Sequence, residues 1–180
     1  MKGTSLTLFL GPQGSFTQQA AKRLMPKAHL REAGSIEEIF ELLDKQKDTY
    51  AVVPLRNSLA GDVSETVALL QRYPMVEIES SHVLKVSLCL AANAAEPVEE
   101  IYSKDIAFEQ CSVFLKVNYP HVKLTKVNST SEGAKLATEN RHTAAICSEL
   151  AANTYGLSVL AKDIQNNQDN QTTFILIRST

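Results

Sequence analysis

Asn166-Asn-Gln-Asp-Asn-Gln-Thr-Thr-Phe-Ile-Leu-Ile177 is the stretch on which the rest of the chain converges. Amide and acid side chains run into Thr172 and Thr173, and these lead into Phe174 and an apolar, β-branched run. A polar loop that feeds a buried strand commonly holds short polar groups at the mouth of a cleft. By itself the stretch also fits a solvated turn before a C-terminal strand, and it is the other polar loops of the chain that favour the cleft.

Length and composition suit a small globular protein. The 180 residues are enough for one domain, or for two small lobes built around a shared sheet, and 44% of them are hydrophobic. The absence of Trp and the 6% aromatic content predict an aliphatic core. The net charge is −2, with no basic stripe, so a nucleic-acid partner is not expected.

The three cysteines and the N-terminal sequence indicate the cellular compartment of the protein. Cys89, Cys111 and Cys147 are widely spaced, which matches neither a metal site nor a disulfide framework and predicts buried free thiols in a reducing compartment. The apolar run Leu6–Leu10 is too short for a signal peptide or a membrane span. The sequence therefore predicts a cytoplasmic protein with no metal and no membrane partner.

One device recurs four times along the chain: a strand, a turn rich in Ser, Thr, Asn or Gly, and then a helix. The turns begin at Gly11, Asn57, Asn128 and Ser148. Alternation of strand and helix indicates an α/β fold, and several helix N-termini suit a small anionic ligand. The glycine turn has neither a Walker nor a dinucleotide spacing, and each turn could instead satisfy its own backbone.

Helix and strand boundaries follow from hydrophobic spacing and caps. We expect strands over Val76–Glu79 and Val83–Ala91, a short strand ending at Ser103, and one helix from Ile106 to Leu115 with Gln110 near its middle. Capping residues are expected at three other helices: Ser35 in a capping box with Glu38, Ser129 or its neighbours, and Ser148, whose helix should stop at Gly156.

Several ordered motifs resemble one family. They are Gly11–Phe16, Val53–Val63, Ser103–Cys111, Ser129-Thr130, Ala145–Ser148, Tyr155–Leu157 and Asn170–Phe174. Together they are similar to the catalytic domain of prephenate dehydratases, from Leu8 to Ile177. The ACT domain and chorismate mutase domain found in some members have no counterpart in the sequence, so feedback by phenylalanine through an ACT domain is not expected.

The resemblance implies a two-lobed α/β fold like that of type II periplasmic binding proteins, with a ligand cleft between the lobes. We expect one lobe over residues 1–79 plus 167–180 and the other over 80–166. It also implies conversion of prephenate to phenylpyruvate, with loss of CO₂ and water, in L-phenylalanine biosynthesis. The expected substrate is a small dianion, no cofactor is expected, and the protein is expected to be a homodimer. Prephenate and its aminated relative arogenate are not distinguished.

Site residues are carried over by motif. Thr172 would hydrogen-bond or protonate the departing hydroxyl, and the other residues expected in catalysis are Asn57, Ser103 and Gln110. Because threonine is a weak acid, positioning and charge stabilisation are its expected roles. The residues expected to bind substrate are Ser58, Gly61, Ser129, Thr130, Thr173, Phe174 and Arg56.

The sequence departs from the family pattern at functional positions. Thr173 replaces the motif arginine, Arg56 replaces a glutamate, and Leu88 and Lys104 replace histidines. Threonine cannot reproduce a bidentate Arg–carboxylate contact. Our hypothesis is that Arg56 or Lys104 now binds the substrate carboxylate; the alternative is that Arg56 is a solvated surface residue.

Two other functions stay open alongside prephenate dehydratase. One is a prephenate-processing relative that decarboxylates without forming the aromatic ring, since the altered motif changes the charge around the leaving groups. The other is a non-catalytic module that binds a small anion. Thr172, Ser103 and Gln110 favour the dehydratase, whereas Thr173 and Leu88 favour the alternatives.

Overall fold

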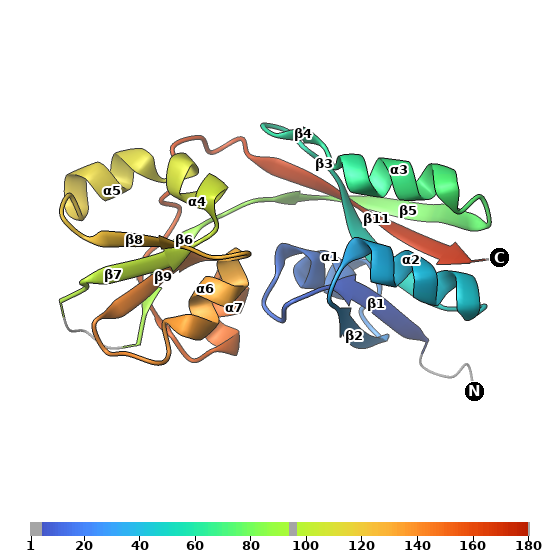
Figure 1. Cartoon of the computed structure of the whole chain (residues 1–180), viewed down its shortest axis with the longest axis horizontal. Helices are drawn as coiled ribbons and strands as arrows, with labels where there is room; N and C mark the ends of the chain where they lie inside the picture. The colour runs from blue at the N-terminus through green and yellow to red at the C-terminus, as the bar shows by residue number, and fades with distance from the viewer. Residues whose placement is uncertain (1–4, 94–96, 180) are drawn as a thin grey trace. The chain divides into compact units, whose positions relative to one another are not determined.

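The computed structural model describes residues 5–93 and 97–179, which group into two compact units (Figure 1). The first comprises the described chain up to Pro12, Phe16–Lys85 and the chain from Asn170 onward. The second comprises Gln13–Ser15 and Val86–Asp169. Neither unit is formed by one continuous segment, so each depends on pairing between residues far apart in the sequence.

The first unit is built on a six-stranded sheet. Its strands are β1 (Leu6–Leu10), β2 (His29–Ala33), β3 (Tyr50–Asn57), β4 (Gly61–Asp62), β5 (Val76–Lys85) and β11 (Gln171–Ser179). The order is β2-β1-β3-β11-β5, and β4 pairs with β3. Strand β1 runs parallel to β2 and β3, whereas β11 is antiparallel to both β3 and β5. The C-terminal strand thus lies inside the sheet, between β3 and β5.

Helices cover both faces of this sheet. They are α1 (Phe16–Leu24), α2 (Ile36–Lys45) and α3 (Ser64–Arg72). Along β11, Phe174 and Leu176 pack in a cluster with Ala20 of α1. The alternate residues Ile175 and Ile177 pack in the cluster that contains residues of α2 and α3. The period-two alternation of β11 therefore buries the strand between two helical layers.

The second unit holds a five-stranded sheet in the order β10-β6-β9-β7-β8. Its strands are β6 (Cys89–Ala92), β7 (Glu100–Ser103), β8 (Lys123–Lys126), β9 (Thr143–Cys147) and β10 (Ser158–Ala161). Its helices are α4 (Asp105–Gln110), α5 (Ser112–Asn118), α6 (Thr130–Leu136) and α7 (Glu149–Thr154). Helices α6 and α7 pack through alanines on the Ala and Cys side chains of β6 and β9. The core is thus mainly aliphatic, as predicted, although Phe9 and Phe40 are among its largest fully buried side chains.

The predicted helix ends are confirmed. Ser35 accepts a hydrogen bond from the Glu38 N–H (3.0 Å), which is one half of the predicted capping box. The Glu38 carboxylate accepts from the Gly34 N–H (2.6 Å), one residue before the cap, rather than from Ser35. Ser129 and Ser148 accept equivalent bonds at the starts of α6 and α7. Gly156 follows α7 with φ of +70°, the left-handed conformation that favours glycine after a helix. These signals are local. The three caps could be predicted because each cap hydrogen bond joins residues only three positions apart.

Several boundaries differ from expectation. Strand β5 is one continuous strand from Val76 to Lys85, where two strands were expected to be separated after Glu79. The strand ends at Lys85, and β6 begins at Cys89. Strands β2 and β10 were not predicted. Strand β5 alternates apolar and polar residues only from Val76 to Glu79, and the polar run from Glu79 to His82 then interrupts the pattern. It is a strand because its backbone pairs with β11 from Val76 to Lys85. The single helix expected over Ile106–Leu115 is two helices, α4 and α5, separated at Cys111.

Across residues 5–93 and 97–179, no helix is both long and apolar enough to cross a membrane. The same described residues contain no group of three His, Cys, Asp or Glu side chains that could hold a metal ion.

Candidate functional site

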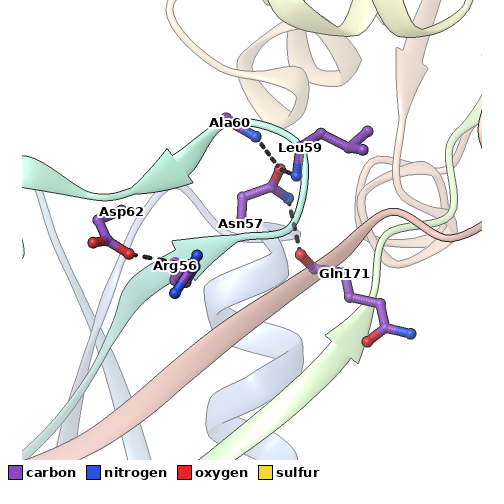
Figure 2. A network of polar contacts seen from close by, with 6 residues as sticks. All are labelled: Arg56, Asn57, Leu59, Ala60, Asp62 and Gln171. Carbon is purple, nitrogen blue, oxygen red and sulfur yellow. Dashed lines mark hydrogen bonds and ion pairs between the residues drawn. The ribbon is translucent and has the colours of Figure 1, made fainter.

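Asn57, at the end of β3, is the centre of a hydrogen-bond network in the first unit (Figure 2). Its Oδ1 accepts from the backbone N–H groups of Leu59 and Ala60, each at 3.0 Å. Its Nδ2 donates to Thr172 Oγ1 (2.9 Å) and to Asn170 Oδ1 (2.8 Å). It also lies 3.1 Å from the Gln171 carbonyl oxygen. One amide therefore shapes its own turn and ties that turn to β11.

The turn after Asn57 is held from both sides. Gly61 has φ of +84° and faces Asn57 across the β3–β4 pair, so it lets the chain reverse where other residues would be strained. The Ser58 N–H donates to the Gln171 carbonyl (2.8 Å), and the Gln171 N–H donates to Ser58 Oγ (2.9 Å). Ser58 and Gly61, predicted as substrate-binding residues, are thus brought into one turn with Asn57.

The hydrogen bond from Asn57 determines what the Thr172 hydroxyl can do. Thr172 is the cross-strand partner of Asn57 and is half-buried. A hydroxyl carries one donor hydrogen and two acceptor lone pairs. Because its oxygen accepts from the Asn57 amide, the Thr172 hydrogen is available to another acceptor, and no group among the described residues takes it. The structure presents Thr172 as an oriented donor.

Arg56 lies between two cross-strand partners, Asp62 on β4 and Thr173 on β11. Its Nε is 3.5 Å from Asp62 Oδ1, and the side chains are 69% and 63% exposed (Figure 2). Such an exposed ion pair is worth about 0 to 1 kcal/mol, so a ligand carboxylate could displace Asp62. The cation is therefore one strand away from Thr173, the position of the family's arginine.

Phe174 has a different setting from its neighbours. It is 2% exposed and belongs to the core cluster under α1, beside Phe9 and Val52. A strand bulge between Thr173 and Phe174 separates this buried residue from the polar end of β11. Phe174 therefore fixes where the polar end begins.

Four predicted site residues lie in the second unit. Ser103 ends β7, is fully buried, and donates its hydroxyl to the Ile146 carbonyl (2.7 Å). Gln110 is half-buried at the last residue of α4, and its carbonyl accepts from the Asn166 N–H (2.6 Å). Ser129 caps α6 and Thr130 is its first residue. The Ser103 hydrogen is thus already used within the protein, so only its lone pairs remain for a ligand.

The polar stretch that opens at Asn166 is divided between the units. Asn166 donates to the Glu109 carbonyl and to Ser112 Oγ and accepts from the Val113 N–H, which explains the break between α4 and α5. Asn170 belongs to the first unit, where it bonds to Asn57. Asn170 lies within a family motif but is not among the predicted site residues. The signal available in the sequence was an amide two residues before Thr172.

The three cysteines are free and buried, as predicted. Burial raises the pKa of the Cys111 thiol to about 12. Cys89 and Cys147 are cross-strand partners in β6 and β9. A hydrogen bond from the Cys147 thiol lowers the pKa of Cys89, and the same bond raises that of Cys147. This pairing is a buried feature of the sheet, and neither thiol is placed to attack an external group.

The two α/β units place the chain in the class of two-unit proteins with the type II periplasmic-binding-protein fold. A nutrient-binding protein from Burkholderia cenocepacia bound to methionine has this fold with a TM-score of 0.50 and 7% identity, the match covering 97% of the chain and 84% of that protein. This likeness shows the fold alone. The prephenate dehydratase family model matches residues 7–180, and the chain belongs to that family.

Individual relatives agree with this assignment. The chain is 35% identical over 172 residues to the bifunctional chorismate mutase/prephenate dehydratase of Aquifex aeolicus (strain VF5), covering 94% of the chain and 47% of that enzyme. It thus spans about half the length of the curated relatives it matches. It also resembles the prephenate dehydratase of Arthrobacter aurescens solved in complex with L-Phe, with a TM-score of 0.89 and 27% identity over 97% of the chain and 60% of that one.

A second solved structure shares the fold under a different activity. GqqA, described as a novel type of quorum-quenching acylase, has a TM-score of 0.85 and 20% identity, and covers 97% of the chain and 64% of its own. At this identity the likeness again shows the fold alone. Since one fold can carry several chemistries, the activity has to be argued from the site.

Proposed function

We propose that the chain is a prephenate dehydratase, a carbon–oxygen lyase that converts prephenate to phenylpyruvate with loss of CO₂ and water. Family membership supports the proposal. The observation that carries it is the bond from Asn57 Nδ2 to Thr172 Oγ1, which leaves the Thr172 hydrogen free to donate. A donor is what the departing hydroxyl needs, because negative charge develops on that oxygen as its bond to carbon breaks.

The reaction asks little covalent chemistry of the protein. The electron pair of the broken C–CO₂ bond enters the ring, the C–O bond to the hydroxyl breaks, and a proton completes the water. Because the ring becomes aromatic, the enzyme has mainly to hold the dianion and stabilise the leaving oxygen. Thr172 acts as a positioned donor, with Asn57 fixing its orientation. In the other unit, we propose Gln110 and the Ser129–Thr130 turn as substrate contacts, with Ser103 accepting through its lone pairs.

Arg56 is proposed to contact a substrate carboxylate in place of the arginine that the family carries at position 173. Two observations support this role. Arg56 is the direct cross-strand neighbour of Thr173, and its pair with Asp62 is long and exposed. Lys104, the other cation considered, is an exposed residue at the start of α4 in the second unit. Arg56 is preferred because it lies beside the altered position.

A single-turnover assay with prephenate, followed by NMR, tests the proposed function. We expect phenylpyruvate to form well above the spontaneous rate, Thr172→Ala to abolish most of that excess, and Thr172→Ser to retain more of it. Thr154→Ala is a matched control, since the exposed Thr154 bonds only to the Leu150 carbonyl of its own helix. A non-aromatic decarboxylated product would indicate a prephenate decarboxylase in place of the dehydratase. Binding of prephenate without turnover would indicate a non-catalytic anion-binding module.

The remaining expectations from the family resemblance are proposed with this function. They are a homodimer, a cytoplasmic location, and two lobes expected over residues 1–79 plus 167–180 and over 80–166. The compact units have different boundaries, after Lys85 and before Asn170, and Gln13–Ser15 belongs to the second unit. Light scattering of the purified chain tests the homodimer, for which a monomer mass at micromolar concentration would be the contrary result. Parallel assays with prephenate and arogenate decide between these substrates, and we expect prephenate to be preferred.

A further inference from the structure

The orientation of three side chains in the first unit follows from one set of hydrogen bonds. The Asn57 side-chain oxygen accepts from two backbone N–H groups, those of Leu59 and Ala60. A flipped amide would place its NH₂ against two donors, so Asn57 has to direct its Nδ2 toward β11. The orientation of the Asn57 amide does not depend on a ligand, since both backbone donors belong to the turn itself.

The orientations of Asn170 and Thr172 are fixed in the same way. Both accept from Asn57 Nδ2, so Asn170 has to present Oδ1 to it and Thr172 its hydroxyl oxygen. These bonds use neither the hydrogens of the Asn170 NH₂ group nor the hydrogen of the Thr172 hydroxyl, so both residues can still donate. The two accepting oxygens lie 2.8 and 2.9 Å from one nitrogen, so the residues are close neighbours.

The Asn170 amide is nearly enclosed yet incompletely bonded. The residue is 1% exposed, and across residues 5–93 and 97–179 no hydrogen bond from its Nδ2 to another group is found. The Nδ2 atom is not among the fully enclosed polar atoms that lack a partner, so part of it stays accessible. Two neighbouring donors without a protein acceptor form a site for an oxygen-bearing ligand group, and Arg56 nearby would favour an anionic one.

We propose that Asn170 is a catalytic residue whose Nδ2 donates, together with the Thr172 hydroxyl, to the oxygen that leaves prephenate as hydroxide. The inference rests on the proposed function and deepens it. Two donors share the developing charge, and Asn57 holds both in place without contacting the leaving oxygen itself. The motif Asn170–Phe174 includes Asn170 but does not give its role, because that role depends on which of its two polar atoms is already occupied.

Asn170→Asp is the sharpest test. The new carboxylate can still accept from Asn57 Nδ2, so the network and the fold are kept, whereas the donor is lost. We expect kcat to fall about 100-fold or more, as on loss of one oxyanion donor, with a smaller change in KM. Asn140→Asp is the matched control, because the exposed Asn140 also accepts through Oδ1, from the His142 N–H at 3.0 Å. It should stay within twofold of the unsubstituted chain.

Lowering the pH adds a readout that a structural role would not move. Protonation of the introduced carboxylate would restore a donor, so the activity of Asn170→Asp should recover toward low pH after subtraction of the uncatalysed rate, relative to the unsubstituted chain. An Asn170→Asp variant with kcat and KM within twofold of Asn140→Asp would overturn the inference. So would a kcat loss with no recovery at low pH.

A second measurement keeps the test independent of turnover and of variant folding. The unsubstituted, ¹⁵N-labelled chain is titrated with a prephenate analogue whose ring is saturated and cannot become aromatic. The side-chain NH₂ signals of Asn170 should shift downfield on binding, and those of Asn140 should not. Absent turnover of prephenate would reject the proposed function and, with it, the catalytic role of Asn170, whereas an unshifted Asn170 signal at saturation would reject this inference alone.

Discussion

Replacement of Asn57 by two different residues should separate the stability of the turn from the activity of the site. In Asn57→Asp, the carboxylate still accepts from the N–H groups of Leu59 and Ala60. It can no longer donate, so the Thr172 hydroxyl would rotate and donate to the carboxylate instead. In Asn57→Ala, neither interaction forms, and the Thr172 hydrogen stays free although its orientation is no longer fixed.

The structure predicts that the two variants rank in opposite orders for unfolding free energy and for kcat. Asn57→Asp should cost about 1 to 2 kcal/mol of unfolding free energy, since the donor bonds are lost and the acceptor bonds are kept. Asn57→Ala should cost about 2 to 3 kcal/mol, because the whole network is lost. For kcat, Asn57→Asp removes the free donor and should lose about 100- to 1000-fold. Asn57→Ala leaves the donor hydrogens of Thr172 and Asn170 free and loses only their positioning, worth about tenfold.

Urea unfolding and single-turnover assays on the same preparations check that stability and activity rank the two variants in opposite orders. The expected result is that Asn57→Asp is the more stable variant and the less active one. If kcat instead falls in the same order as stability, with Asn57→Ala worse in both, the variants would act through the turn alone. That result would show that Asn57 does not free the Thr172 hydrogen.

Three further perturbations have defined outcomes. Arg56→Gln should raise KM for prephenate about tenfold with little change in kcat, and adding Thr173→Arg should restore KM in steady-state assays; no restoration would contradict the proposed carboxylate contact. Gly14→Ala should lower the urea midpoint by the equivalent of about 2 kcal/mol, since φ is +83° and the added Cβ would lie 2.6 Å from a backbone atom of α7; Gly156→Ala, with φ of +70° and open space, should cost less. Burial raises the pKa of Cys111 from 9.0 to about 12 in the folded chain. As the pH rises, the thiol therefore loses its proton first in the unfolded chain. The unfolding free energy should fall above pH 9.0, the unfolded-state pKa, by at most about 1.4 kcal/mol per pH unit. Urea titrations from pH 8 to about pH 10 should show a smaller decline in Cys111→Val, and equal slopes would contradict the raised pKa.

Local signals in the sequence determined more of the fold than of the site. The caps at Ser35, Ser129 and Ser148, the stop at Gly156 and the apolar strand that begins at Phe174 all appear in the structure as expected. Each depends on contacts within a few residues or on a period that can be counted. The family assignment likewise came from ordered motifs and is shown by the match over residues 7–180.

Long-range pairing explains what the sequence could not supply about the fold. Strand β2 (His29–Ala33) is mostly exposed and polar, and it exists because β1 pairs with all five of its residues. Strand β5 passes through Ser80 and Ser81 without apolar alternation because β11 lies beside it. The break between α4 and α5 comes from Asn166, more than fifty residues further along the chain.

The sequence by itself determined the family, the α/β class and the presence of Asn57, Thr172 and the Thr173 and Arg56 exchanges. Tertiary structure alone decided which atoms of those residues are free. The bonds from Asn57 to Asn170 and Thr172 join residues 113 and 115 positions apart, and an amide or hydroxyl can donate or accept until its neighbours occupy one side of it. The identity of a polar residue is a property of the sequence, whereas the direction of its hydrogen bonds is fixed only when the folded chain supplies the partners.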